Sequence, residues 1–443
     1  MFGRPPGGSL IGMTDNATLP RGARALDAAT PADRDRYADL LRLFSIGMVA
    51  VGHWVVALLT VNGAGTLGTA MPAMLSTWVW QVMALFFFVG GFAHARALRH
   101  DVPCRVSVGR RTGRPRRAAG SAGGDFVRSR VARLLPPVLA MLVIWTGLAL
   151  AMQAAGLTGG VFAVGRRIIT VPLWFIGVYL LVVLAAPAMM RLHRRHGLWP
   201  VFGALAAAAG VVDLAATSVP LVGYANMLFV WLAVHQLGYA YADGTLLRGG
   251  RRLASAFAVG GLAGAALLVF GTDRYPVLMV GLPGNEASNS APPTLALLGQ
   301  GVFLVGVALL LRPAGTALAA RPRAWLVVAA GNSMIMTIFC WHLTACYLVQ
   351  GFLLLTGVTV PAASALPLWL LACTLVCALL VVALRRFERP RPAGTGHPAA
   401  AVAGTVAAAL GLFAISRLGL DSAAWPQLTS LALLAAGVLT LRR

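Results

Sequence analysis

The feature that most constrains this chain is a series of long apolar segments separated by short polar ones. Most of these segments reach the ~18–20 residues that an α-helix needs to cross a bilayer. Only 11% of all residues are charged, against about 25% in a soluble domain. The sequence therefore predicts an all-α, polytopic transmembrane helical bundle. The twelve segments lie at about 41–60, 74–95, 134–154, 168–190, 198–217, 223–242, 253–271, 293–311, 324–350, 364–384, 399–416 and 426–441.

The basic residues occupy alternate loops. The chain has no lysine, and 32 of its 36 arginines lie in the two ends of the chain, counted through Arg42 at the start of the first segment, and in the loops after even-numbered segments. Cytoplasmic loops of membrane proteins carry an excess of Lys and Arg. The split therefore predicts twelve spans in the cell (inner) membrane with both termini in the cytoplasm. The arginine-rich cytoplasmic loops also account for the net charge of +23, so this charge does not indicate nucleic acid binding.

The cysteines and the N-terminal residues point to no further kind of site or targeting segment. Four of the five cysteines lie in predicted spans and Cys104 lies in an arginine-rich loop, a pattern that indicates neither a disulfide framework nor a metal site. We therefore expect no bound metal. Residues 1–38 are polar and lack the apolar core of a signal peptide, so we expect a disordered cytoplasmic segment there.

The first predicted span, LLRLFSIGMVAVGHWVV, carries an arginine near one end and a histidine near its middle. On a helix, Arg42 and His53 lie on almost the same face, about 16 Å apart along the axis. Asp39 falls near that face as well. An ionisable residue deep in a membrane span is costly and faces a cavity or a partner. His53 is therefore either a functional residue or a packing histidine bonded to a neighbouring helix.

The third predicted span begins with an arginine pair. In FVRSRVARLLPPVLA, Arg130 and Arg133 are three residues apart, beside Arg128. Guanidinium groups bind phosphates in a bidentate manner, so the pair suits a polyphosphate ligand. The alternative interpretation is the ordinary positive flank of a membrane helix.

Two later segments contain further candidate residues. The stretch GNSMIMTIFCWHLTACYL places His342 deep in the predicted span 324–350, where it could line a cavity or bond across helices. Trp174, in TVPLWFIGVYLL, is either a pocket wall or an anchor at the membrane interface. Asp213 and His235 are also polar residues within spans, and the sequence gives no role for either.

Taken in order, these motifs resemble those of the acyltransferase-3 family of integral membrane acyltransferases. They are Arg42-x10-His53, Arg130-x2-Arg133, LWFIGVYLL, CWHL and FERP, the last at Phe387 to Pro390. The resemblance covers about residues 35–392, and it implies a ten-helix acyltransferase core over residues 39–392. Residues 393–443 form two additional C-terminal helices, in which this chain departs from a bare ten-span unit.

The resemblance also implies an activity. Family members move an acyl group, commonly acetyl, from cytoplasmic acyl-CoA to a hydroxyl of a glycan, a lipid-linked sugar or a secondary metabolite. Acyl-CoA is then a substrate, and no bound cofactor is expected. By this resemblance His53 is the essential histidine and Arg42 its companion, Arg130 and Arg133 engage the CoA phosphates, and His342 lines the pocket.

These expectations combine into a mechanism. The phosphates of acyl-CoA would bind at the arginines, and the pantetheine arm would run inward beside the first span to His53. His53 would act as general base on the acceptor hydroxyl, or would itself attack the thioester to give an acyl-imidazole.

Two other classes of protein fit parts of the sequence. A secondary transporter also has twelve spans with both termini inside, but no internal repeat relates the two halves, and among intramembrane carboxylates only Asp213 is a fair candidate for proton coupling. A non-catalytic membrane scaffold would share the topology without needing the arginine and histidine pattern.

Overall fold

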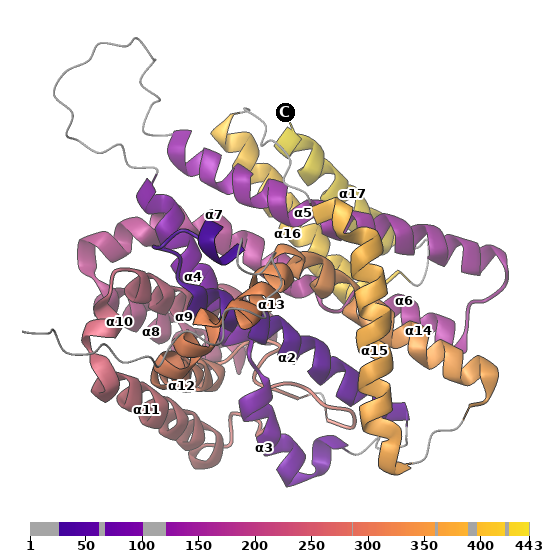
Figure 1. Ribbon diagram of the computed structural model, residues 1–443, viewed down its shortest axis with the longest axis horizontal. Coiled ribbons are helices and arrows are strands. Elements are labelled where there is room, and N and C mark those ends of the chain that lie inside the picture. The colour runs from indigo at the N-terminus through magenta and orange to yellow at the C-terminus, as the bar shows by residue number, and fades with distance from the viewer. Residues whose placement is uncertain are drawn as a thin grey trace, which may run out of the picture.

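The computed structural model of the chain describes residues 26–61, 67–100, 121–285, 287–358, 362–388, 397–420 and 425–442. Within these ranges the named elements are all α-helices or short 3-10 helices (Figure 1). The first half contains α2 (Arg36–Val61), η1 (Leu67–Thr69), α3 (Met71–Trp80), α4 (Met83–His100), α5 (Ser121–Ala154), α6 (Gly160–Ile168), α7 (Leu173–His196), α8 (Leu198–Ala216) and η2 (Pro220–Ala225). The second half contains α9 (Asn226–Ala242), α10 (Thr245–Arg248), α11 (Gly250–Gly271), α12 (Leu295–Ala320), α13 (Pro322–Ser333), α14 (Ile335–Thr356), α15 (Ala362–Leu384), η3 (Arg385–Glu388), α16 (Pro398–Leu418) and α17 (Trp425–Arg442).

The helices confirm the predicted fold class. Eleven helical stretches of the described residues are long and apolar enough to cross a membrane. A twelfth, shorter apolar stretch is Gln427–Leu441 in α17. These twelve stretches match the twelve predicted segments in order, so the protein is an all-α, polytopic bundle with many membrane-spanning helices.

Two of the predicted spans are broken rather than continuous. The segment predicted at 324–350 is divided between α13 and α14, and Met334 between them adopts φ −126° and ψ 16°. The segment predicted at 74–95 is divided between α3 and α4, and Gln81 lies at that break. In both places the backbone groups freed by the break are bonded by side chains from elsewhere. The Gln300 amide donates to the carbonyl oxygens of Trp78 and Gln81.

Part of the N-terminal segment is ordered, contrary to the expectation for residues 1–38. Residues 26–38 are described and contact the bundle at several points. Asp33 pairs with Arg96 of α4, and Asp35 accepts a hydrogen bond of 2.7 Å from the Tyr241 hydroxyl of α9. These contacts fix the start of α2 against α4 and α9. Residues 1–25 and most of the arginine-rich loop, including Cys104, lie outside the described residues.

Helices α4 and α9 approach each other closely because each has a glycine at the crossing point. A Cβ on Gly91 would collide with the carbonyl oxygen of His235, and a Cβ on Gly238 would collide with the carbonyl oxygen of Phe88. Small residues at helix crossings allow this kind of close packing in membrane bundles. The crossing matters for the site, because it brings His94 of α4 beside His235 of α9.

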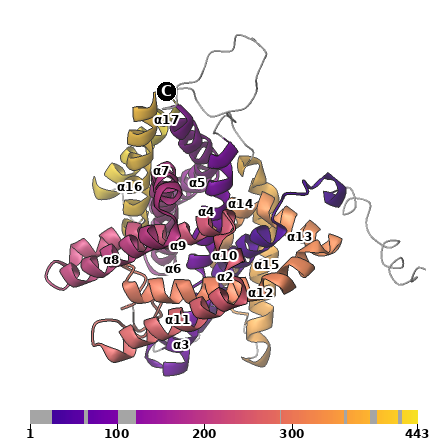
Figure 2. The same ribbon diagram turned by 90° about the vertical axis from the view of Figure 1, so that its left-hand side faces the viewer.

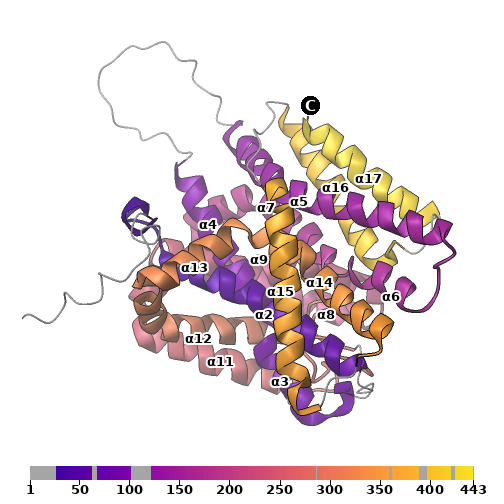
Figure 3. The same ribbon diagram turned by 45° about the vertical axis from the view of Figure 1, so that its right-hand side comes forward.

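The C-terminal helices form a pair at the edge of the bundle. Figures 2 and 3 show α16 and α17 side by side on one side of the molecule. The pair is attached through α16, because Gly177 of α7 packs directly against the backbone of Ala409 and Phe413. The two helices therefore support α7, which contributes residues to the site, rather than forming a separate unit.

Asp213, a polar residue without a predicted role, anchors the segment between α11 and α12. Its carboxylate accepts hydrogen bonds from the Asn226 amide (2.8 Å), the Tyr275 hydroxyl (3.0 Å) and the backbone N–H of Leu295 (2.8 Å). Three donors on one carboxylate satisfy most of its acceptor capacity. This residue is therefore occupied in holding the segment in place.

We expect Gly238→Ala to destabilise the protein, because its methyl group would push α4 away from α9. Overpacking of this kind typically costs about 1–3 kcal/mol. The control is Gly264→Ala on α11, where a Cβ meets nothing within 4 Å and where alanine favours the helix. Thermal unfolding in detergent should give a lower midpoint for Gly238→Ala than for the control. Equal midpoints would show that the close approach is not needed.

Candidate active site

Helix α2 carries both ends of the candidate site. It is continuous from Arg36 to Val61, so the predicted geometry of Arg42 and His53 holds: they lie on nearly one face, about 16 Å apart along the axis. His53 is partly buried. The candidate site is therefore a line along one helix with a cation near its start and an imidazole further along.

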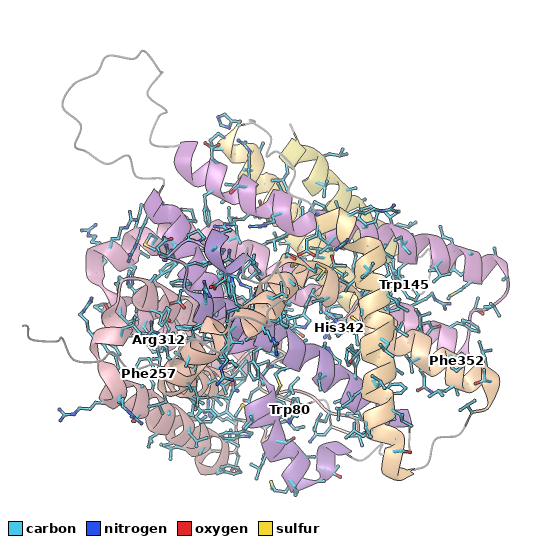
Figure 4. The ribbon with its side chains drawn as sticks, in the orientation of Figure 1. Trp80, Trp145, Phe257, Arg312, His342 and Phe352 are labelled. Carbon is cyan, nitrogen blue, oxygen red and sulfur yellow. The ribbon has the colours of Figure 1, made fainter. Side chains whose placement is uncertain are left out.

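His53 contacts a second histidine from α14. Its Nδ1 lies 2.9 Å from Nε2 of His342, and the two rings stack with centroids 5.1 Å apart and planes 19° apart. The other ring nitrogen of His342, Nδ1, lies 2.7 Å from the carbonyl oxygen of Phe339. Figure 4 places His342 in the interior of the molecule, and its exposed fraction is only 1%. The structure thus brings together two residues that are 289 positions apart in the sequence.

Tryptophans hold the histidine pair in position. The indole N–H of Trp54 donates to the carbonyl oxygen of His342 at 2.8 Å. The indole N–H of Trp369, from α15, donates to the carbonyl oxygen of Trp54, also at 2.8 Å. Because Trp54 follows His53 directly, these bonds fix α2 against α14 and α15 next to the imidazole.

The FERP motif supports the same helix through its glutamate. The Glu388 carboxylate accepts hydrogen bonds from the backbone N–H groups of Met336 (3.0 Å) and Thr337 (2.9 Å), and from the Thr337 hydroxyl (2.6 Å). The first N–H groups of a helix have no partner within the helix, and a negative charge there is favourable. Glu388 therefore caps α14 where it begins after the break at Met334. Sequence reasoning quoted this motif without finding the role of the glutamate.

A second pair of histidines lies nearer the start of α2. His94 Nδ1 lies 2.9 Å from His235 Nε2, and His94 Nε2 lies 3.3 Å from the Tyr179 hydroxyl. His94 and His235 are buried. Sequence reasoning missed His94, because a histidine within an apolar helix gives no signal until its partner on another helix is known.

Arg42 and Arg130 both lie near this second pair. The Arg130 guanidinium is 5.5 Å from the centre of the Phe126 ring, and that ring is 5.3 Å from His94, measured between centroids. Both arginines are close enough to His94 for their charges to act on it. Asp39 lies there too, 3.8 Å from Arg42, while its carboxylate bonds more closely to Arg34 at 2.7 Å.

The other arginines at the start of the third span point to different surroundings. Arg133 is exposed. Arg128 is buried and donates to the carbonyl oxygen of His397, the residue that caps the start of α16. Of the predicted pair, only Arg130 therefore joins the group around His94.

Aromatic rings connect the two histidine pairs. Phe175 of α7 lies 5.3 Å from Phe339 and 5.7 Å from Tyr179, measured between ring centroids. Phe339 is in turn 6.0 Å from His342. Trp174 contacts the same aromatic group through Phe175 and Trp231 rather than through His53. The wall between the two polar groups is thus apolar and largely aromatic.

A cavity of about 420 Å³ opens at the N-terminal end of α2. It is rich in cations, since four arginines and two aspartates line it together with aromatic rings. Arg312 of α12 is one of these residues, and its Nε donates to the Tyr241 hydroxyl at 2.9 Å. Figure 4 shows Arg312 on the opposite side of the molecule from Trp145. The arginines are Arg34, Arg36, Arg96 and Arg312.

The described residues contain no group of three or more His, Cys, Asp or Glu side chains placed to hold a metal ion. The side chains that the structure gathers along α2 are imidazoles, guanidinium groups, a tyrosine hydroxyl and the Asp39 carboxylate. A partly buried imidazole with a fixed partner is suited to proton transfer.

The fold and the site together define a multi-pass membrane protein with a paired histidine, His53 and its buried partner His342, on a helix that begins with cations. Comparison with protein families agrees with this class: a family model described as an acyltransferase domain matches residues 35–386. The chain belongs to this acyltransferase-3 family and is a membrane acyltransferase. Comparison with curated proteins and with solved structures gave no match.

Loss of the cap on α14 should weaken the site. Glu388→Ala leaves two N–H groups at the start of α14 without their partner, and losing a helix cap costs about 0.5–2 kcal/mol. We expect a lower thermal midpoint than for the wild-type protein, and a smaller decrease for Glu388→Gln, which keeps one acceptor oxygen. Arg385→Ala, in the same 3-10 helix, is the control. A Glu388→Ala midpoint equal to that of the control would contradict the capping role.

Proposed function

We propose that the protein transfers an acyl group, acetyl in the simplest case, from cytoplasmic acyl-CoA to a hydroxyl of a glycan, a lipid-linked sugar or a secondary metabolite. His53 is the general base. The observation that carries the proposal is the pairing of His53 with His342 at 2.9 Å, about 16 Å along α2 from Arg42. An imidazole placed in this way suits proton transfer from an acceptor hydroxyl.

The bond changes follow from the chemistry of a thioester. His53 removes the proton of the acceptor hydroxyl while the hydroxyl oxygen attacks the acyl carbonyl carbon. The carbon–oxygen bond of the new ester forms and the carbon–sulfur bond breaks. The proton then passes from His53 to the leaving thiolate of CoA. The reaction needs no oxidant and no metal ligand, and a positioned histidine contributes about 10²–10⁴-fold to such a step.

The charged end of the donor would bind at the start of α2. Arg42 and Arg130 both lie near His94 and would offer two guanidinium groups to the phosphates, and Arg133 would contact the donor from the exposed surface. The arginine-lined cavity lies beyond them, at the first residue of α2, about 26 Å from His53 along the axis. Such a line of cations suits a donor with several phosphates and a long neutral arm.

The acceptor would meet the donor at His53 in the interior of the bundle, in the inner membrane with both termini cytoplasmic, as the arginine distribution favours. The transporter alternative has less support. Its one candidate carboxylate, Asp213, already accepts three hydrogen bonds from its surroundings. A carboxylate bonded in this way is poorly suited to carrying protons.

We expect His53→Ala to abolish acyl transfer, because the acceptor hydroxyl loses its base. The assay follows radiolabelled acetyl-CoA in membranes that contain the protein, measuring label moved to the membrane and extractable glycans or metabolites. Transfer should fall by about 10²-fold or more. Thermal unfolding of the purified variant checks that it is folded. A folded His53→Ala protein with wild-type transfer would exclude this assignment.

The arginines should affect the binding of the donor and not the rate of the chemical step. We expect Arg130→Ala and Arg312→Gln to raise the KM for acetyl-CoA while leaving kcat nearly unchanged. Acetyl-phosphopantetheine, which lacks the nucleotide, separates the two positions: its KM should change little in Arg312→Gln. Arg323→Gln, on α13, is the control. A KM for acetyl-CoA unchanged in both variants would remove the arginines from donor binding.

A further inference from the structure

We infer that His342 is a positioning residue that fixes which ring nitrogen of His53 acts as the base. The inference rests on the proposed function and extends it to a single atom, Nε2 of His53. The hydrogen bonds of the two rings lead to this assignment, because a neutral imidazole has one N–H donor and one acceptor nitrogen.

The backbone determines the protonation state of the His342 ring. A carbonyl oxygen only accepts hydrogen bonds, so the 2.7 Å contact with the Phe339 oxygen requires a hydrogen on Nδ1 of His342. A doubly protonated ring would place a charge at a residue that is 1% exposed, and a buried charge is costly without an opposite charge beside it. The polar contacts of this ring in the described part of the chain are with His53 and with the backbone carbonyl oxygens of Phe339 and Ile338, and none of these groups carries a negative charge. His342 is therefore neutral, and its Nε2 is an acceptor.

The state of His53 follows from that of His342. Because Nε2 of His342 accepts, Nδ1 of His53, 2.9 Å away, is the donor and carries the hydrogen. Nε2 of His53 then has the free lone pair. No hydrogen bond joins this atom to another described residue, and His53 keeps part of its surface accessible. The nitrogen that could accept a proton from a substrate is thus the one that the pairing leaves available.

The same contact would stabilise the protonated form of His53 that arises during the reaction. When Nε2 takes the proton of the acceptor hydroxyl, His53 becomes a cation that still donates from Nδ1 to His342. A hydrogen bond from a charged donor is roughly twice as strong as a neutral one. In serine hydrolases an aspartate orients the catalytic histidine in this way. Here a neutral histidine, itself held by a backbone carbonyl, would do the same.

Three variants test the inference. His342→Phe keeps a flat ring but removes the acceptor, whereas His342→Gln keeps an oxygen that can reach Nδ1 of His53. We expect His342→Phe to lower kcat by about 10²-fold or more with little change in the KM for acetyl-CoA. The kcat of His342→Gln should be at least tenfold higher than that of His342→Phe. The control is Thr344→Val. Thr344 is also buried on α14, and its hydroxyl accepts a hydrogen bond of 3.1 Å from the Trp145 indole N–H.

Nitrogen NMR gives a readout that does not depend on transfer. The chain has eight histidines, and the His53 signals of the ¹⁵N-histidine-labelled protein in nanodiscs are identified by their loss in His53→Ala. We expect a protonated Nδ1 and an unprotonated Nε2 at neutral pH, and a mixture of tautomers in His342→Phe.

The outcomes separate this inference from the proposed function. A protonated Nε2 on His53 in the wild-type protein overturns the inference, and so does an unchanged tautomer in His342→Phe. Equal loss of kcat in the Phe and Gln variants also overturns it, since packing alone would then explain the effect. If the tautomers are as expected but the wild-type protein transfers no acyl group, the proposed function fails while the orientation of His53 stands.

Discussion

The contact between His53 and His342 is the constraint around which the site is organised. It joins the first long helix to one near the end of the acyltransferase domain, and most of the supporting structure acts on one of its two members. Trp54 and Trp369 hold α2 against its neighbours beside His53. Glu388 caps the helix that carries His342. These residues hold the backbone on either side of the pair, and their hydrogen bonds go to backbone groups rather than to either imidazole ring.

The break between α13 and α14 has a physical purpose within this arrangement. A continuous helix from 322 to 356 would bond its own N–H groups and would leave Glu388 without its two backbone partners. Starting a new helix at Ile335 frees those groups for the carboxylate. The helix therefore begins at a fixed point, about two turns before His342. Fixing the start of a helix is an efficient way to fix a side chain in its second or third turn.

The sequence predicted the fold and part of the site, and the limits of the prediction have a clear cause. Apolar segments and arginine-rich loops identify spans, because both are local properties of the chain. The Arg42 to His53 spacing could also be read, since both residues lie on one helix. The partners could not: His342 is 289 positions from His53, and no periodicity relates them. His94 and Glu388 were missed for the same reason, since each acquires its role only from a distant helix.

A neutral partner would suit His53 in the proposed role of base. An aspartate in place of His342 would also orient His53, but its charge would be buried where water cannot reach it, and an unpaired buried charge costs several kcal/mol. A carbonyl oxygen alone could accept from His53 but would be fixed in place by its own helix. A histidine held by the carbonyl of Phe339 has neither problem, because it is uncharged and its acceptor nitrogen lies at the end of a side chain. Orientation can therefore be obtained in an apolar bundle without a permanent charge.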